Sequence, residues 1–238
     1  MATQISAIES QARALLEELS PRHWTSAELT SIIGNGIRDL WRSIVDLKGE
    51  HFLVVNTTDV TMPANSDTLL GVPKNVHKVY AIEPVDISDS STATGRHLGF
   101  MPIDYNHKYF QSARARTAAT PDEASTIYYA ITGAGGPATA PTIYVAPQVD
   151  ATVSLRFAYI PTLGELNSSN YVPIPGEADN ALIAWTVAYA RAKELESRAP
   201  DDNWLRIYST EKQNLLNSLG VRQYQEPQFV DAMFEEYW

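Results

Sequence analysis

The sequence predicts an α+β protein: a discontinuous helical bundle of two N-terminal and two C-terminal helices, an antiparallel β insertion, and an extended C-terminal arm. Apolar residues recur every three or four positions near both ends of the chain, which is the period of a helix face. Between them, short runs rich in Val, Thr and Tyr alternate with turn residues, which favours hairpin strands. We therefore expect residues 1–49 and 161–222 to form the bundle, 50–160 the β-rich insertion and 223–238 the arm.

Two helices are expected at the N-terminus. The first ends at the Ser-Pro pair of residues 20–21, because a residue before proline is pushed out of the helical region. The second begins at a capping box formed by Thr25 and Glu28. Gly34 and Gly36 interrupt its apolar face, which predicts a kink, the close approach of another backbone, or simply a weak point.

The middle of the chain is expected to be a series of short strands. They cover Phe52–Met62, Val76–Glu83, Thr126–Thr132, Thr142–Ala146 and Ala151–Ile160. The glycine-rich run between the third and the fourth is flanked by strands on both sides, and it lacks the Lys and helix that a phosphate loop needs. We interpret it as a hairpin loop.

Helix is expected to return near Gly176 with an alanine-rich segment. Asp201 or Asp202 can cap the next helix, which is expected to end at Gly220. Each helical pair is too small to bury both of its faces alone, so the two pairs are expected to pack together. Three tryptophans on these faces, Trp41, Trp185 and Trp204, are expected in the core.

The composition excludes several classes of function. The net charge is −10, with 18 basic residues scattered among 28 acidic ones, so stable binding of nucleic-acid phosphates is not expected. There is no cysteine, which removes disulfides, thiolate metal sites and cysteine nucleophiles. No apolar stretch is long enough to span a bilayer and no signal peptide is recognisable, so a soluble cytoplasmic product is expected.

The order of segments between Tyr128 and Leu219 carries a family resemblance. TIYYAIT is followed by TIYVAPQVDATVSLRFAYIPTLGEL, a proline-rich linker, ADNALIAWTVAYARAKELE and WLRIYSTEKQNLLNSL. A strand pair that ends in an aromatic-x-x-Pro step, a linker, an alanine-rich helix and a helix with spaced Tyr and Leu resemble phage head-to-tail adaptor proteins. The N-terminal helices, with Asn35 and Trp41, fit the same resemblance.

The resemblance implies a structural protein of the virion neck, assembled in the host cytoplasm. Such adaptors form a homo-oligomeric ring, commonly of about twelve subunits, under the portal protein, and a closed ring demands heterologous interfaces. The other face of the ring meets a tail or nozzle protein, and DNA passes through the lumen without sequence-specific binding. A C-terminal arm commonly reaches the portal.

The last sixteen residues, Gln223–Trp238, are expected to be that arm. They contain five aromatic residues and four acids but no base, have no clean period, and carry Pro227 as a breaker. A segment with no fold of its own and with apolar groups to bury is suited to ordering on a partner. The residues expected to contact the portal are Tyr224, Phe229, Asp231, Phe234, Glu235, Glu236, Tyr237 and Trp238. The alternative is a tail that folds back onto its own domain.

No catalytic or cofactor signature is found. The five histidines lie in different predicted elements, no Gly-x-Ser-x-Gly elbow is present, and adjacent acids are expected by chance at this composition. The prediction is therefore a non-enzymatic adaptor without cofactor or metal. Two other functions stay open: a virion-associated peptidoglycan-degrading enzyme, which would need paired carboxylates, and a tail or receptor-binding module.

Overall fold

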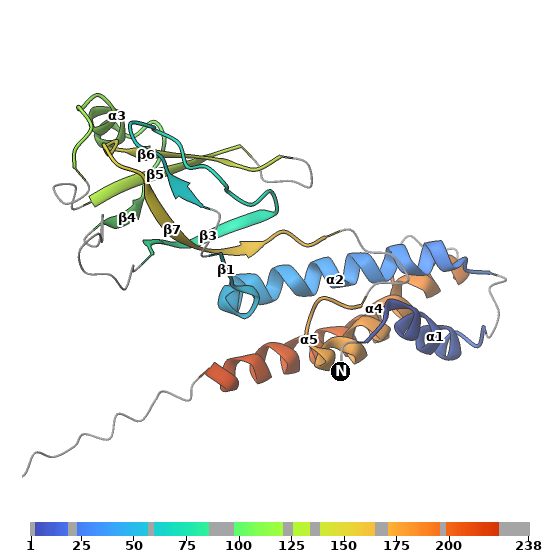
Figure 1. Ribbon diagram of the computed structural model, residues 1–238. Coiled ribbons are helices and arrows are strands. Elements are labelled where there is room, and N and C mark those ends of the chain that lie inside the picture. The colour runs from blue at the N-terminus through green and yellow to red at the C-terminus, as the bar shows by residue number, and fades with distance from the viewer. Residues whose placement is uncertain are drawn as a thin grey trace, which may run out of the picture. The chain divides into compact units, whose positions relative to one another are not determined.

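Figure 1 shows the computed structural model, which describes residues 3–18, 23–56, 60–85, 98–120, 126–133, 139–164, 171–195 and 199–223. The protein is α+β, as predicted. The chain divides into two compact units. One, the helical unit, contains Met1–Lys48 and Glu165–Trp238, and the other, the β unit, contains Gly49–Gly164.

The helical unit is built from α1 (Ile5–Leu15), α2 (Ser26–Lys48), α4 (Asp179–Glu194) and α5 (Asp202–Gln223), with a short 3-10 turn, η2 (Gly176–Ala178). Helix α4 packs against α1, α2 and α5, and α2 also contacts α1 and α5. Because neighbours cover it on three sides, α4 buries residues on much of its circumference, and its alanines let the neighbours approach closely. Helix α5 continues through Gly220, where the sequence predicted its end.

The predicted capping box begins α2. The backbone N–H of Thr25 donates to Glu28 Oε2 at 2.8 Å, and the N–H of Glu28 donates to Thr25 Oγ1 at 3.2 Å. This reciprocal pair satisfies two N–H groups at the start of the helix. The capping-box prediction is confirmed.

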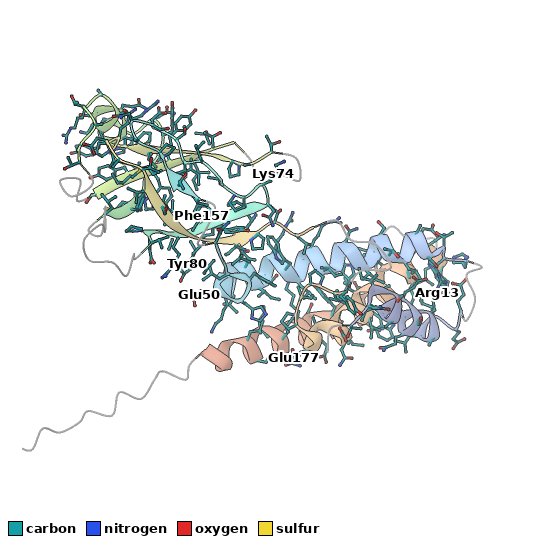
Figure 2. All side chains as sticks on the ribbon, in the orientation of Figure 1. Arg13, Glu50, Lys74, Tyr80, Phe157 and Glu177 are labelled. Carbon is teal, nitrogen blue, oxygen red and sulfur yellow. The ribbon has the colours of Figure 1, made fainter. Side chains whose placement is uncertain are left out.

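Helix α1 ends at Leu15, earlier than the predicted stop at residues 20–21. The chain turns at Glu17, whose φ is 57°, and the carboxylate of Glu18 then reaches back to Arg13 Nη1 at 2.9 Å. Arg13 also bonds Glu9 Oε1 at 2.9 Å and the carbonyl of Trp24 at 3.0 Å, and its side chain is nearly buried (Figure 2). A buried guanidinium needs these partners, and the turn after α1 supplies two of them.

Gly36 allows α2 and α4 to approach each other. A Cβ atom at this position would lie 2.8 Å from Cδ1 of Trp185, whose indole N–H donates to the carbonyl of Ile32 at 3.0 Å. Helix α2 runs uninterrupted through both glycines, so they do not break the helix. Of the alternatives that the sequence left open, the structure shows a close approach at Gly36, made by an indole ring rather than by a backbone. Trp41 is in the core as predicted, whereas Trp185 and Trp204 are only half-buried.

The β unit is centred on β7 (Val153–Pro161). It pairs antiparallel with β3 (Val76–Pro84), with β1 (Val54–Asn56) at residues 157–159, and with β2 (Thr61–Met62) at residues 153–154. The prediction of a single strand over Phe52–Met62 is wrong, because a 3-10 turn, η1 (Gly49–Phe52), and two short strands occupy this stretch.

A second sheet has the order β4 (Gly99–Pro102), β5 (Thr126–Thr132) and β6 (Thr142–Ala146). β5 and β6 pair antiparallel from Thr132↔Thr142 onward, which confirms the hairpin, although its loop residues 134–138 lie outside the described residues. The purely antiparallel sheet that the sequence predicted is wrong, because β4 pairs parallel to β5. A parallel partner needs a crossover connection, and here the unpredicted helix α3 (Lys108–Arg114) forms part of it.

Both sheets contribute to one core. Val79 and Phe157 come from the first sheet, Ile127 and Val145 from the second, and all four side chains are buried in the same cluster. A smaller cluster joins Phe110 of α3 to the second sheet. The β unit therefore has a hydrophobic core of its own.

Candidate functional site

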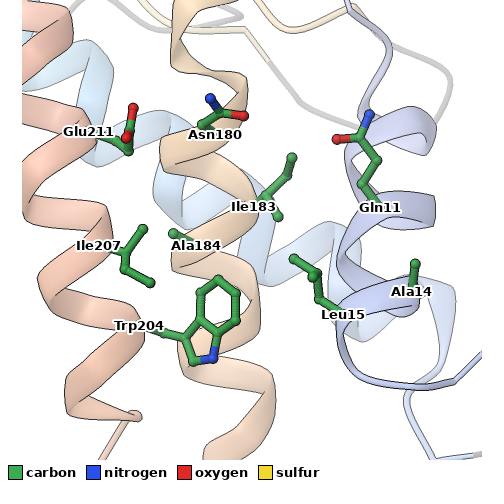
Figure 3. Close-up of a pocket in the computed structure, with 9 residues that line it drawn as sticks. All are labelled: Gln11, Ala14, Leu15, Asn180, Ile183, Ala184, Trp204, Ile207 and Glu211. Atoms are coloured by element: carbon green, nitrogen blue, oxygen red, sulfur yellow. The ribbon is translucent and has the colours of Figure 1, made fainter.

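The helical unit carries an apolar groove bounded by α1, α4 and α5 (Figure 3). Its volume is about 470 Å³. The lining residues come from α1 and from the consecutive helices α4 and α5, which are distant from α1 in sequence: Gln11, Ala14, Leu15, Asn180, Ile183, Ala184, Trp204, Ile207 and Glu211.

The groove has a buried floor and exposed walls. Ile183 and Ala184 of α4 form the floor and are nearly inaccessible. The walls are Leu15 of α1 and Ile207 of α5, whose side chains are 43% and 44% exposed. Large apolar side chains that stay this exposed around a concavity are typical of a surface that binds another apolar group.

The polar residues of the groove gather at one end. Figure 3 shows Gln11, Asn180 and Glu211 toward one end, and Trp204 toward the other. Of the lining residues that the structure describes, Glu211 alone is charged. Among the described lining residues there is no cation, so the lining itself favours an apolar ligand over an anionic one.

The turn between α4 and α5 positions Trp204. Asp201 Oδ1 accepts the backbone N–H groups of Asn203 at 2.9 Å and Trp204 at 3.2 Å, which confirms Asp201 as the cap of α5. The guanidinium carbon of Arg191 lies 5.9 Å from the centroid of the Trp204 ring, and Arg191 Nη1 is 3.9 Å from Asp201 Oδ2. These contacts fix the indole at the end of the groove.

A polar cluster ties α5 to α2. Lys212 Nζ lies 2.6 Å from Asp39 Oδ2, and the hydroxyl of Tyr208 donates to the same oxygen. Burial and the bond to Asp39 raise the pKa of Tyr208 far above its ordinary value. Burial opposes ionisation of Asp39, but the bonds from Lys212 and Tyr208 outweigh it, so the pKa of Asp39 is lowered. The cluster holds the groove's α5 wall in place with ionised Asp39.

A second concavity lies in the β unit between β3 and the segment that follows β4. Its volume is about 770 Å³, and its lining includes His77, Tyr80, Asp104 and His107. The hydroxyl of Tyr80 donates to Glu50 (both labelled in Figure 2), and this bond raises the pKa of Tyr80. The mixed, largely exposed lining offers no single ligand chemistry.

A comparison with protein families identifies the chain. The model of the SU10 adaptor protein family matches residues 3–230, nearly the whole sequence. The chain belongs to this family. It is a family of phage head-to-tail adaptors, so the resemblance drawn from the order of segments is confirmed. No match was found among curated proteins.

The predicted contact residues of the adaptor's arm all lie outside the described residues. They are Tyr224, Phe229, Asp231, Phe234, Glu235, Glu236, Tyr237 and Trp238. The groove was missed by sequence reasoning, which assigned Trp204 to the core. On α5, Trp204 and Glu211 each lie four residues before a buried residue, Tyr208 and Leu215, so helical spacing alone could not separate the groove lining from the core.

The described part of the adaptor shows no group of three or more His, Asp or Glu side chains that could hold a metal ion. Among its described helices, none is both long and apolar enough to cross a membrane. In the described part of the groove lining, the acid Glu211 has no histidine, serine or lysine beside it. This arrangement suits binding of an apolar group and lacks the paired acid and base of a catalytic site.

Proposed function

We propose that this chain is the subunit of a homo-oligomeric ring that docks on the portal protein in the virion neck and gives the tail or nozzle protein its platform. The observation that carries the proposal is the adaptor family match over residues 3–230. The mechanism is assembly: each interface is modest, and repetition around a ring of about twelve subunits converts weak contacts into a stable attachment by avidity. DNA passes through the lumen, and a net charge of −10 disfavours its adhesion.

The two-part organisation supports this role. Residues 1–49 with 161–222 would act as a discontinuous bundle that shares one helical core, while residues 50–160 would supply a separate β surface for a second partner. One subunit can then present different surfaces to different neighbours, as heterologous ring contacts require.

The arm, residues 223–238, would fasten the subunit to the portal. Phe229 and Phe234 would be the apolar anchors, followed by Tyr224, Tyr237 and Trp238. The acids Asp231, Glu235 and Glu236 would select a basic surface on the portal. Gln223, the first residue of the arm, is also the last residue of α5, so the arm's anchors are tethered to a helix that the Asp39 cluster holds to α2.

Removal of residues 224–238 tests the arm. In a pull-down on the cognate portal protein, the truncated subunit should lose binding while its helical circular dichroism is unchanged. A subtler variant, Phe229→Ser with Phe234→Ser, should behave like the deletion, whereas the control Gln225→Ser with Gln228→Ser, two polar positions of the same arm, should bind normally. Full retention of portal binding by the folded truncation would rule out this role for the arm.

The non-enzymatic part of the proposal has its own test. The purified subunit should release no dye from labelled peptidoglycan. Turnover that disappears on substitution of one Asp or Glu, in a variant that still folds, would instead establish the hydrolase.

A further inference from the structure

The groove and the arm match in apolar character. Leu15 and Ile207 expose apolar surface on the groove walls, and the arm carries more aromatic side chains than any other segment of its length in the chain. Removing water from both apolar surfaces lowers the free energy, so contact between them is favourable. A volume of about 470 Å³ is sufficient for an aromatic side chain together with its neighbours.

Chain length decides which arm residue reaches the groove. The groove spans Glu211 to Trp204 on α5, which lie twelve and nineteen residues before the last helical residue, Gln223. At a rise of about 1.5 Å per residue, these levels are about 18 and 28 Å from the end of the helix. An extended chain that reverses in a turn of about three residues and returns at about 3.3 Å per residue covers this interval with residues 232–235.

We propose that, in a subunit that has not met the portal, the arm folds back antiparallel to α5 and places Phe234 in the groove between α1, α4 and α5. The groove then stores the arm's anchor until the portal competes for it. The storage role rests on the proposed portal function of the arm, but the fold-back itself does not. Because the arm is tethered to α5, which forms one wall of the groove, a weak apolar contact suffices to hold it.

The electrostatics distinguish the stored arm from the portal-bound arm. Glu211 carries the one charge among the described lining residues, and it has the same sign as the arm's acids, so the stored contact must be apolar. It should depend little on salt, whereas a contact between the acids and a basic portal surface should weaken as salt increases.

The absence of cysteine allows a direct test on the full chain. Gln11→Cys, at the groove end that also holds Asn180, is combined with Ala232→Cys in the arm. The control pair combines Ala232→Cys with Gln213→Cys, which lies on an exposed face of α5 away from the groove. Under mild oxidation the groove pair should form an intramolecular disulfide at least about tenfold faster than the control pair.

Two further substitutions separate the anchor from the rest of the arm. Phe234→Ser should reduce the rate of the groove pair to that of the control, whereas Phe229→Ser, which the chain length places outside the groove, should leave it unchanged.

Substitutions in the groove walls test the other side of the contact. Leu15→Ser and Ile207→Ser, on opposite walls, should each slow disulfide formation, and circular dichroism would confirm that these variants fold. Raising the salt concentration should have little effect.

Equal rates of disulfide formation in the groove pair and the control pair would overturn the proposal. Disulfide-linked dimers at dilute protein concentration would also overturn it, because they would show that the arm binds a neighbouring copy. The measurement contains no portal protein. If it fails while arm deletion still abolishes portal binding, the fold-back is wrong and the proposed function stands. If the groove pair reacts as expected but deletion leaves portal binding intact, the arm is stored without being a portal contact.

Discussion

At the scale of single residues, Gly36 sets the distance between α2 and α4. Alanine at an exposed helical position usually stabilises by about 1 kcal/mol relative to glycine. At Gly36, however, the new Cβ would meet the Trp185 indole at 2.8 Å, so Gly36→Ala should instead lower the free energy of unfolding by about 1–3 kcal/mol. Urea unfolding measures the change. In a protein that also carries Trp185→Leu, Gly36→Ala should lower the free energy of unfolding by less. If the loss is the same, the indole is not its cause.

The buried Arg13 network makes a larger prediction. Arg13→Met keeps the length of the side chain but leaves the carboxylates of Glu9 and Glu18, both nearly buried, without their shared cation. We expect the free energy of unfolding to fall by about 3–5 kcal/mol. Arg38→Met, on the exposed face of α2, is the control and should change it by less than about 0.5 kcal/mol. If Arg13→Met lowers the free energy of unfolding as little as Arg38→Met does, the network adds no stability.

Single residues also show what sequence alone could and could not predict. The capping box and the Asp201 cap were predictable because each depends on contacts within a few residues. The end of α1 was not, since it involves the turn that brings Glu18 and the carbonyl of Trp24 back to Arg13. The groove depends on three helices that meet only in the folded unit, so no local pattern contained it.

At the scale of elements, Glu28 couples the start of α2 to the end of α4. Its carboxylate accepts from Lys193 Nζ at 2.8 Å and from Thr25, and these bonds lower its pKa from the ordinary 4.5 to about 2. A lowered pKa means that the stabilisation is fully present above about pH 4.5 and is lost as the pH falls toward 2.

We therefore expect Glu28→Gln to destabilise the protein at neutral pH and to reduce the loss of stability between about pH 4.5 and pH 2. Denaturant unfolding across this range measures both effects. Wild type and variant should converge near pH 2. The exposed Glu17→Gln provides the control, and an acid slope in Glu28→Gln equal to that of wild type would contradict the assignment.

Most long elements were predictable, and the short ones were not. The helices α2, α4 and α5 and the strands β3, β5, β6 and β7 each contain enough residues to show their period. The strand β4 has four residues and the helix α3 has seven, which is too short for a pattern to emerge from its surroundings. Parallel pairing of β4 with β5 is a property of the crossover between them, so alternation along either strand could not predict it.

At the scale of the whole molecule, the helical unit is interrupted in sequence by the complete β unit. Helices α1 and α2 precede the interruption, and α4 and α5 follow it, yet α4 contacts both α1 and α2. Core residues such as Ile8, Ile37 and Leu182 are fully buried within this unit. The β unit has its own core, which includes Phe157. Two separate cores favour two separate folding units.

The last prediction is that the helical unit folds without the β unit. Residues 49–164 would be replaced by a Gly/Ser linker of about ten residues, long enough to leave the ends free to find each other. The variant should keep its helical circular dichroism and unfold in one cooperative transition, because the surface that each helical pair must bury is supplied by the other pair. Adding Leu182→Asp to the same variant places an unpaired charge in that shared core and should abolish the transition. A gradual, non-cooperative melt of the variant without Leu182→Asp would show that the helices depend on the β unit, and the discontinuous bundle would then be wrong.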